Sequence, residues 1–155
     1  MNFIMSAACL IVFASMTGNT EEIANLISEG IHAEGGGVEI KDILEVDVKD
    51  LLDYDAILLG SYTWGDGELP DEFLDFYEEM DGLNLKGKKA AVFGSYDSAY
   101  GNIGRAVDIL SEKLLELGAM VILDGLKIEL SPNAVESEQC IQFGKFFERT
   151  IKMER

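Results

Sequence analysis

The sequence predicts an α/β fold with an open, doubly wound parallel sheet that has helices on both faces. Short apolar runs alternate along the chain with stretches that have the spacing of amphipathic helices. Several runs show no polar alternation, which is typical of parallel strands covered on both faces. The βαβαβ succession favours right-handed crossovers. The 155 residues contain two prolines and no Pro/Gly/Ser-rich linker, so we expect a single domain over residues 1–155.

The expected strands are the apolar runs at residues 10–14, 38–43, 56–59, 90–93 and 119–123. The expected helices carry four apolar stripes, which should face the core. These stripes are Ile23, Ile27 and Ile31; Phe73, Phe76, Tyr77 and Met80; Ile103, Val107, Leu110, Leu114 and Leu117; and Cys140, Phe143, Phe147 and Ile151. Glycines at 35–37 and at 118 end the first and third helices, and Pro70 opens the second.

Three of the expected strands end in a small residue followed by serine. These pairs are Ala14-Ser15, Gly60-Ser61 and Gly94-Ser95. Each pair precedes a loop that is rich in Gly, Thr, Asn, Asp or aromatic residues. Ligands of open α/β sheets bind beyond the carboxyl ends of the strands, where the strand order switches. We therefore expect the three loops to meet at one edge of the sheet and to form a single site.

The first loop concentrates hydrogen-bond donors at the start of a helix. It consists of Ser15, Met16, Thr17, Gly18, Asn19 and Thr20. A strand-to-helix turn offers unpaired backbone N–H groups and the positive end of the helix dipole, and Gly18 lets the backbone approach an anion closely. The loop lacks the lysine and the first glycine of the P-loop of nucleotide triphosphatases. It therefore suits a terminal monophosphate held by neutral donors, although the same residues would also form an ordinary N-cap.

Aromatic side chains outside the apolar stripes also occur in the second loop, residues 60–70, and in the third loop, residues 94–102. Trp64, the only tryptophan, follows a polar stretch and precedes glycine, which favours a planar partner over a core position. The alternative is a tryptophan that folds over helix ends. In the third loop, Asp97 lies between Tyr96 and Tyr100, and a tyrosine there could cover the opposite face of the same ligand. The three loops together indicate a phosphate at one end and an aromatic sandwich at the other.

These motifs resemble those of the flavodoxin family in its short-chain form. The first loop matches the family's Ser/Thr-x-Thr-Gly-x-Thr phosphate motif, Thr63-Trp64-Gly65 matches the loop on the inner flavin face, and residues 94–100 match the loop on the outer face. The similarity covers residues 8–151. The fifth strand, over residues 120–123 and 126–130, leaves no room for the insertion of about 20 residues found in long-chain members. The resemblance implies a five-stranded sheet in the order 2-1-3-4-5 and non-covalently bound flavin mononucleotide (FMN).

The resemblance also assigns the cofactor site. The expected FMN-binding residues are Ser15, Met16, Thr17, Gly18, Asn19, Thr20, Ser61, Tyr62, Thr63, Trp64, Gly65, Asp66, Gly67, Ser95, Tyr96, Asp97, Tyr100 and Gly101. Either Tyr96 or Tyr100 would stack on the outer face of the flavin. The peptide between Gly65 and Asp66 would flip so that its carbonyl reaches the flavin N5. No catalytic residue and no metal ligand is expected.

The implied function is that of a low-potential one-electron carrier between redox enzymes, without substrate turnover of its own. The sequence holds no nucleophile–base pair, no acid pair in a cleft and no second substrate motif. A more specialised relative is the alternative: a flavoprotein that activates ribonucleotide reductase, or an FMN-dependent reductase. A response-regulator receiver has the same kind of sheet, but it needs acidic residues where this chain has Ala14-Ser15 and Gly60-Ser61.

The formal net charge of −17 narrows the range of partners. Nucleic acids and anionic membranes bind clusters of Lys and Arg, so we expect neither as a partner. The charge serves solubility, or it steers a basic partner. We expect basic redox proteins, namely flavodoxin or ferredoxin reductases and acceptor oxidoreductases, to approach an acidic face of a monomeric chain. That acidic face comprises Asp66, Glu68, Asp71, Glu72, Asp75, Glu78 and Glu79.

The remaining signals indicate a cytoplasmic protein. Cys9 and Cys140 lie in unrelated apolar patterns, which predicts buried thiols and neither a disulfide nor a metal site. His32 is the only histidine, so a His-based metal site or catalytic triad is not expected. The apolar N-terminal stretch lacks the positive n-region of a signal peptide, and no run reaches the roughly 20 apolar residues of a membrane helix.

Overall fold

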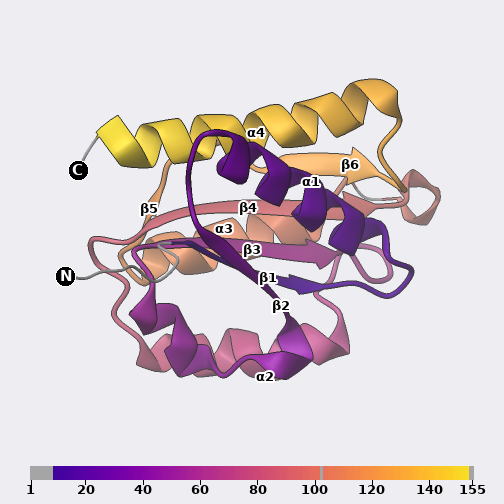
Figure 1. Ribbon diagram of the computed structural model, residues 1–155. Coiled ribbons are helices and arrows are strands. Elements are labelled where there is room, and N and C mark those ends of the chain that lie inside the picture. The colour runs from indigo at the N-terminus through magenta and orange to yellow at the C-terminus, as the bar shows by residue number, and fades with distance from the viewer. Residues whose placement is uncertain (1–8, 102, 154–155) are drawn as a thin grey trace.

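The computed structural model describes residues 9–101 and 103–153. Within them, one parallel sheet has the strand order β2-β1-β3-β4-β5, and β6 also pairs with β4 (Figure 1). The strands are β1 (Cys9–Ala14), β2 (Val38–Asp42), β3 (Ala56–Tyr62), β4 (Lys89–Tyr96), β5 (Met120–Val121) and β6 (Leu126–Glu129). This order confirms the expected doubly wound sheet. Ala8, the first residue of the similar stretch, and Asn102, the last of the third loop, lie outside the described residues.

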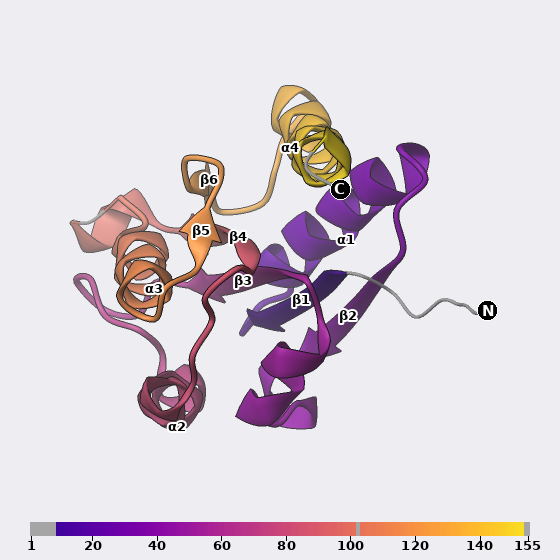
Figure 2. The same cartoon turned by 90° about the vertical axis from the view of Figure 1, so that its left-hand side faces the viewer.

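Helices cover both faces of the sheet, as the alternating pattern predicted. α1 (Asn19–Ala33) and α4 (Ala134–Met153) lie on one face, and α2 (Asp71–Glu79) and α3 (Arg105–Glu116) lie on the other (Figure 2). Short 3-10 turns connect these elements: η1 (Ile43–Glu45), η2 (Val48–Asp53), η3 (Met80–Gly82) and η4 (Ser98–Tyr100). Each face of the sheet has its own cluster of buried apolar side chains.

The strand β3 shows why the apolar runs lack polar alternation. Ile57 and Leu59 belong to the cluster under α2 and α3, whereas Ala56 and Leu58 belong to the cluster under α1 and α4. Successive side chains of a strand point to opposite faces, so a strand that is covered on both faces must be apolar at every position. Such a strand cannot be exposed on either face without losing part of the core.

The helical stripes face the core, with one exception. In α1, Ile23, Ile27 and Ile31 are fully buried. The prediction for Ile103 is wrong: it lies outside α3 and is 67% exposed. Gly104, which precedes the helix, has a left-handed φ of 65°. The chain therefore turns between Ile103 and α3, and the 3.6-residue period does not extend back across the turn.

The fifth position in the sheet is filled by two short strands instead of one. β5 pairs with the start of β4 and β6 with its end, where Tyr96 lies opposite Glu129. The apolar run at residues 119–123 forms only the first of these strands, and the second lies within residues 126–130, which were also expected to belong to the fifth strand. A side chain at Gly125, between the two strands, would place its Cβ only 2.4 Å from a methyl carbon of Val107. The chain passes close to α3 at this point, before it rejoins the sheet as β6.

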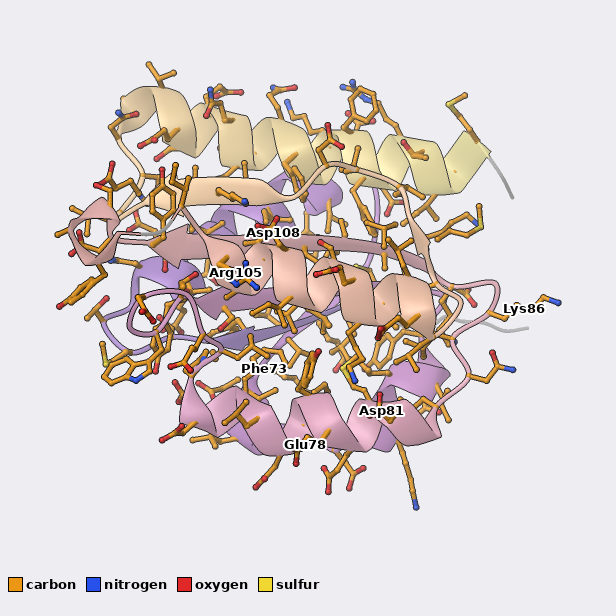
Figure 3. The ribbon with its side chains drawn as sticks, turned by 180° about the vertical axis from the view of Figure 1, so that it is seen from behind. Phe73, Glu78, Asp81, Lys86, Arg105 and Asp108 are labelled. Carbon is orange, nitrogen blue, oxygen red and sulfur yellow. The ribbon has the colours of Figure 1, made fainter. Side chains whose placement is uncertain are left out.

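A buried lysine joins α3 to the end of α2. Phe73 points from α2 toward the sheet, whereas Glu78 points outward (Figure 3). Lys113 of α3 donates a hydrogen bond to Asp81 in η3 and lies 4.1 Å from the ring centroid of Tyr77. Burial opposes the charge of Lys113, yet the hydrogen bond to Asp81 and the neighbouring Tyr77 leave its pKa raised. Lys113 therefore stays charged and holds α2 in place on this face.

Both cysteines are buried and free, as the sequence predicted. Burial raises the pKa of the Cys140 thiol to about 11 and raises that of Cys9 as well. Neither thiol is therefore ionised to a useful extent near neutral pH. Among residues 9–101 and 103–153, none of the helices combines the length and apolarity that a bilayer crossing requires.

Candidate functional site

Three loops meet at the carboxyl ends of β1, β3 and β4 and enclose a cleft of about 300 Å³. The lining residues are Met16, Thr17, Asn19, Tyr62, Thr63, Trp64, Gly65, Ser95, Tyr96, Asp97, Tyr100 and Leu130. The parallel register produces this convergence, because it aligns Ala14 with Ser61 and Tyr62 with Ser95 across adjacent strands. The volume is at the lower end of the roughly 300–1,000 Å³ that ligand pockets occupy.

The first loop is folded around the hydroxyl of Ser15. Its Oγ accepts the backbone N–H of Gly18 at 3.0 Å and that of Glu21 at 3.4 Å. Gly18, which precedes α1, has a φ of 90°, and a Cβ there would meet nothing within 4 Å. The glycine is therefore required by the left-handed turn and leaves open space beside the backbone.

Four backbone N–H groups of this loop remain available for a ligand. The hydrogen bonds found among the described residues leave the N–H groups of Met16, Thr17, Asn19 and Thr20 without an acceptor. The side chains of Met16 and Thr17 are exposed, and α1 begins at Asn19. An anion placed here would meet unpaired donors and the positive end of the helix dipole together.

Thr20 differs from its neighbours, because its side chain is buried. Its hydroxyl shares a 2.8 Å hydrogen bond with that of Ser95, which is only 4% exposed. The Thr20 hydroxyl therefore ties the first loop to the third. Thr20 was expected among the FMN-binding residues, and the structure already gives its hydroxyl a protein partner.

The second loop turns tightly after Thr63. Trp64 and Glu68 exchange two backbone hydrogen bonds of 2.7 and 2.9 Å, so the loop between them closes on itself. Thr63 fastens the base of this turn: its N–H donates to the Ser95 carbonyl at 3.1 Å, and its Oγ1 accepts the N–H of Ala106 in α3 at 3.1 Å. The Trp64 side chain remains 49% exposed beside the cleft. A large apolar ring held by a fixed backbone is thus left available for stacking.

The third loop presents two tyrosines to the cleft with different exposure. Tyr96 is half-buried, whereas Tyr100 is 62% exposed. Between them, the Asp97 carboxylate accepts the N–H of Ala99 at 2.9 Å and caps the short turn η4. Both tyrosines line the cleft, so the geometry leaves either of them able to cover a bound ring.

Tyr62 joins the cleft to α2. Its hydroxyl donates to a carboxylate oxygen of Glu72 at 2.6 Å. Burial, and then the hydrogen bond to Glu72, raise the pKa of the Tyr62 phenol. The phenol therefore stays neutral and acts as a fixed donor, which links the end of β3 to the acidic helix.

Comparison with known proteins decides the family. A family profile described as flavodoxin matches residues 11–144. This chain belongs to the flavodoxin family. "Probable flavodoxin 2" of Bacillus subtilis is 44% identical over 142 residues, which cover 91% of this chain and 94% of the relative.

Two solved flavodoxins from Bacillus cereus have closely similar structures. Oxidised flavodoxin 1 is 54% identical with a TM-score of 0.88, and the match covers 91% of this chain and 97% of that one. Oxidised flavodoxin 2 is 47% identical with a TM-score of 0.90 and covers 93% of this chain and 99% of that one. Flavodoxins are FMN-containing electron carriers and not enzymes, so this chain is such a carrier. The short-chain flavodoxin fold is confirmed, and this fold is itself a standard example of ligand binding at the strand ends.

The residues of this flavodoxin fit FMN by their chemistry. Among the described residues that line the cleft, none is Lys or Arg, and Asp97 is the only one with a carboxylate. A phosphate would be held by neutral N–H groups at short range, which outweigh distant carboxylates because salt screens charges beyond roughly 8–10 Å. Among the described residues, no group of three or more His, Cys, Asp or Glu side chains could hold a metal.

Several of the residues expected at the flavin site do not line the cleft. These are Ser15, Gly18, Thr20, Ser61, Asp66, Gly67 and Gly101. Ser61 is fully buried and donates to the carbonyl of Tyr62 at 2.8 Å. Gly67 lies against the stem of Arg105, whose Cδ would be 2.8 Å from a Cβ added there. These two residues shape the loops from behind the lining.

Leu130 lines the cleft and was missed by the sequence analysis. It follows β6, so it lies at a strand end like the other lining residues. The rule that ligands bind at carboxyl strand ends could have found it. It was not predicted because none of the three motif loops contains it.

Proposed function

We infer that this flavodoxin carries single electrons at low potential, with FMN bound non-covalently between the three loops as one domain in the cytoplasm. The observation that carries the proposal is the cleft itself, because free backbone donors of the first loop and the exposed rings of Trp64 and Tyr100 border the same cavity. The first loop, together with Ser15 and Gly18, would hold the phosphate. Trp64 would lie on one flavin face and Tyr96 or Tyr100 on the other.

FMN supplies the redox chemistry when bound, and the protein supplies its surroundings. Aromatic rings stacked on the flavin, and the nearby carboxylates of Asp66, Glu68 and Asp97, would all disfavour a negative charge on the flavin ring. They would therefore lower the potential at which the second electron is accepted. Four further residues of these loops would position the loop backbones around the flavin: Ser61, Gly67, Ser95 and Gly101.

Titration of the apoprotein with FMN tests this proposal. We expect one equivalent of FMN to bind with quenching of its fluorescence, because the ring stacks on Trp64. A reductive titration of the yellow holoprotein should then show two separate one-electron steps. Failure to take up FMN, or reduction in a single two-electron step, would contradict the proposal.

Gly65→Ala is expected to narrow the gap between the two one-electron potentials by about 40–90 mV. Gly65 lies at a φ of 57°, a conformation that costs a residue with Cβ about 1–2 kcal/mol, and 1.4 kcal/mol corresponds to about 59 mV for one electron. A Cβ there would have room, since its nearest neighbour is an oxygen of Glu68 at 3.8 Å. The effect would come from the backbone, which could no longer turn a carbonyl freely toward the ring. Potentiometry measures the gap, with Gly82→Ala as the control, and an unchanged gap would rule the mechanism out.

The family implies redox protein partners, and we propose that these are basic reductases and acceptors that dock on the acidic face. Phe73 and Phe76 are buried in the core on one side of α2, so the carboxylates on the other side of this helix face outward. Asp71, Asp75, Glu78 and Glu79 are exposed, as are Asp66 and Glu68 in the loop beside the cleft. A basic partner guided to this face would arrive near the flavin edge.

Reduction by a basic reductase should slow by about tenfold or more as ionic strength rises from about 0.01 to 0.15 M, because the Debye length falls from about 30 to 8 Å. The double variant Asp75→Asn/Glu78→Gln should flatten this dependence. Glu29→Gln/Glu138→Gln, an equal charge change on exposed positions of α1 and α4, should not. Stopped-flow kinetics measure the rates. A salt-independent rate would contradict the docking proposal and would leave FMN binding untouched.

A further inference from the structure

The end of β6 contacts the third loop at two successive residues. Leu130 donates its backbone N–H to the carbonyl of Tyr96 at 2.8 Å. A carboxylate oxygen of Glu129 accepts the backbone N–H of Ser98 at 3.2 Å and also the hydroxyl of Ser98. Figure 1 shows the tip of β6 beside the turn that carries Tyr100. The end of β6 therefore contacts the third loop, although β6 does not belong to any of the three loops that carry the family motifs.

The turn of the third loop has few other attachments. Its remaining hydrogen bonds are local: Ala99 and Tyr100 donate to Asp97, and Gly101 donates to Ser98. Among the described residues, the hydrogen bonds that join residues 98–101 to the rest of the fold all go to Glu129. The hydrogen bonds inside a short 3-10 turn have poorer geometry than those of an α-helix, so such a turn is weakly stabilised by itself. The Glu129 carboxylate is therefore the hydrogen-bonding contact that ties the turn carrying Tyr100 to a strand outside the loop.

Leu130 has an unusual backbone for its side chain. Its φ of 58° is the only positive φ of a non-glycine residue in the part of the chain that the structure describes. The left-handed region is costly for a residue with Cβ, and such outliers persist where the surroundings over-determine them. The side chain is 50% exposed and lines the cleft beside Tyr96 and Tyr100. The strained backbone directs an apolar group to the cleft and not into the core.

We propose that Glu129 and Leu130 are positioning residues of the flavin site. Glu129 holds the Tyr100 turn closed over the cleft through Ser98, and Leu130 supplies an apolar edge to the cavity. The inference rests on the proposed placement of FMN between the loops. It adds a fourth segment to the site, at the carboxyl end of the last strand.

Two kinds of variant separate the hydrogen bonds from the charge of Glu129. Ser98→Ala removes the hydroxyl donor without changing the charge, and Glu129→Ala removes the acceptor for both Ser98 donors. We expect FMN to bind about threefold more weakly to Ser98→Ala and about tenfold more weakly to Glu129→Ala. Glu129→Gln keeps an acceptor and should lie closer to the native affinity. Glu112→Ala, an exposed carboxylate on α3, is the control and should bind FMN normally.

The potential of the second electron provides a readout that a merely structural role would not move. Opening of the Tyr100 turn admits water to the ring, which favours its anionic reduced form. Ser98→Ala should therefore raise this potential although the charge of the protein is unchanged. If Glu129 acted through its charge alone, Glu129→Gln and Glu129→Ala would shift the potential equally and Ser98→Ala would not shift it.

Leu130 is tested by two variants that both remove the side chain beyond Cβ from the cleft. Leu130→Gly accepts the left-handed backbone and Leu130→Ala does not, so the glycine apoprotein should unfold at the higher denaturant concentration. Both should bind FMN several-fold more weakly than the native chain.

The outcomes distinguish this inference from the proposed function. If native apoprotein does not bind FMN, the proposed function fails and the inference fails with it. If native apoprotein binds FMN while Ser98→Ala, Glu129→Ala and both Leu130 variants bind it equally well, only the inference is overturned. If Glu129→Ala does not fold, the FMN affinity of Ser98→Ala and the potential of its second electron test the inference instead.

Discussion

Replacing Thr17 with aspartate is expected to weaken FMN binding by at least about 100-fold, because it places a carboxylate in the loop that we propose holds a phosphate dianion. Two like charges about 4 Å apart repel by about 4 kcal/mol at an effective dielectric of 20, and each 1.4 kcal/mol is tenfold in affinity. Thr17 is exposed and lines the cleft, so the substitution disturbs no buried contact. Fluorescence titration of the apoprotein measures the affinity.

The controls isolate the phosphate from the flavin ring. Thr17→Asn has nearly the shape of the aspartate and no charge, and it should bind FMN within about tenfold of the native chain. Riboflavin, which lacks the phosphate, should bind equally to all three proteins. Equal loss of FMN and riboflavin in Thr17→Asp would show that the loop does not hold the phosphate.

Gly144→Ala is expected to destabilise the apoprotein by about 3 kcal/mol, although alanine favours an isolated helix by about 1 kcal/mol over glycine. A Cβ at Gly144 in α4 would lie 2.0 Å from the carbonyl oxygen of Ile27 in α1. A Cβ at Gly30 would lie 2.0 Å from the carbonyl oxygen of Ile141. The two helices touch backbone to backbone, so an added methyl group must push them apart. Urea unfolding of the apoprotein measures the loss.

Gly82→Ala is the matched control for this prediction. A Cβ at Gly82 would meet nothing within 4 Å, and its backbone is not left-handed. Its free energy of unfolding should stay within about 0.5 kcal/mol of the native value. If Gly144→Ala were as stable as the native chain, α1 and α4 would not cross as closely as the structure places them.

The crossing of α1 and α4 could not be predicted from the sequence. Read alone, Gly30 and Gly144 are helix-interior glycines that weaken their helices. These glycines allow α1 and α4 to pack closely, and the two helices are more than 100 residues apart in the chain although they meet on one face of the sheet. The buried pair of Thr20 and Ser95 is similar, since its hydroxyls come from different loops. Composition and period describe each segment but carry no information on which segments touch.

The sequence by itself determined the sheet, the covering helices and the location of the site. Uninterrupted apolar runs require burial on both faces, and small residues with serine at the strand ends mark the edge where loops converge. Only the tertiary structure decided how the third loop is held and that Leu130 faces the cleft. The physical reason is that periodicity shows which side of each segment must be buried. The break between β5 and β6 and the contacts of Glu129 depend instead on residues that are distant in the chain.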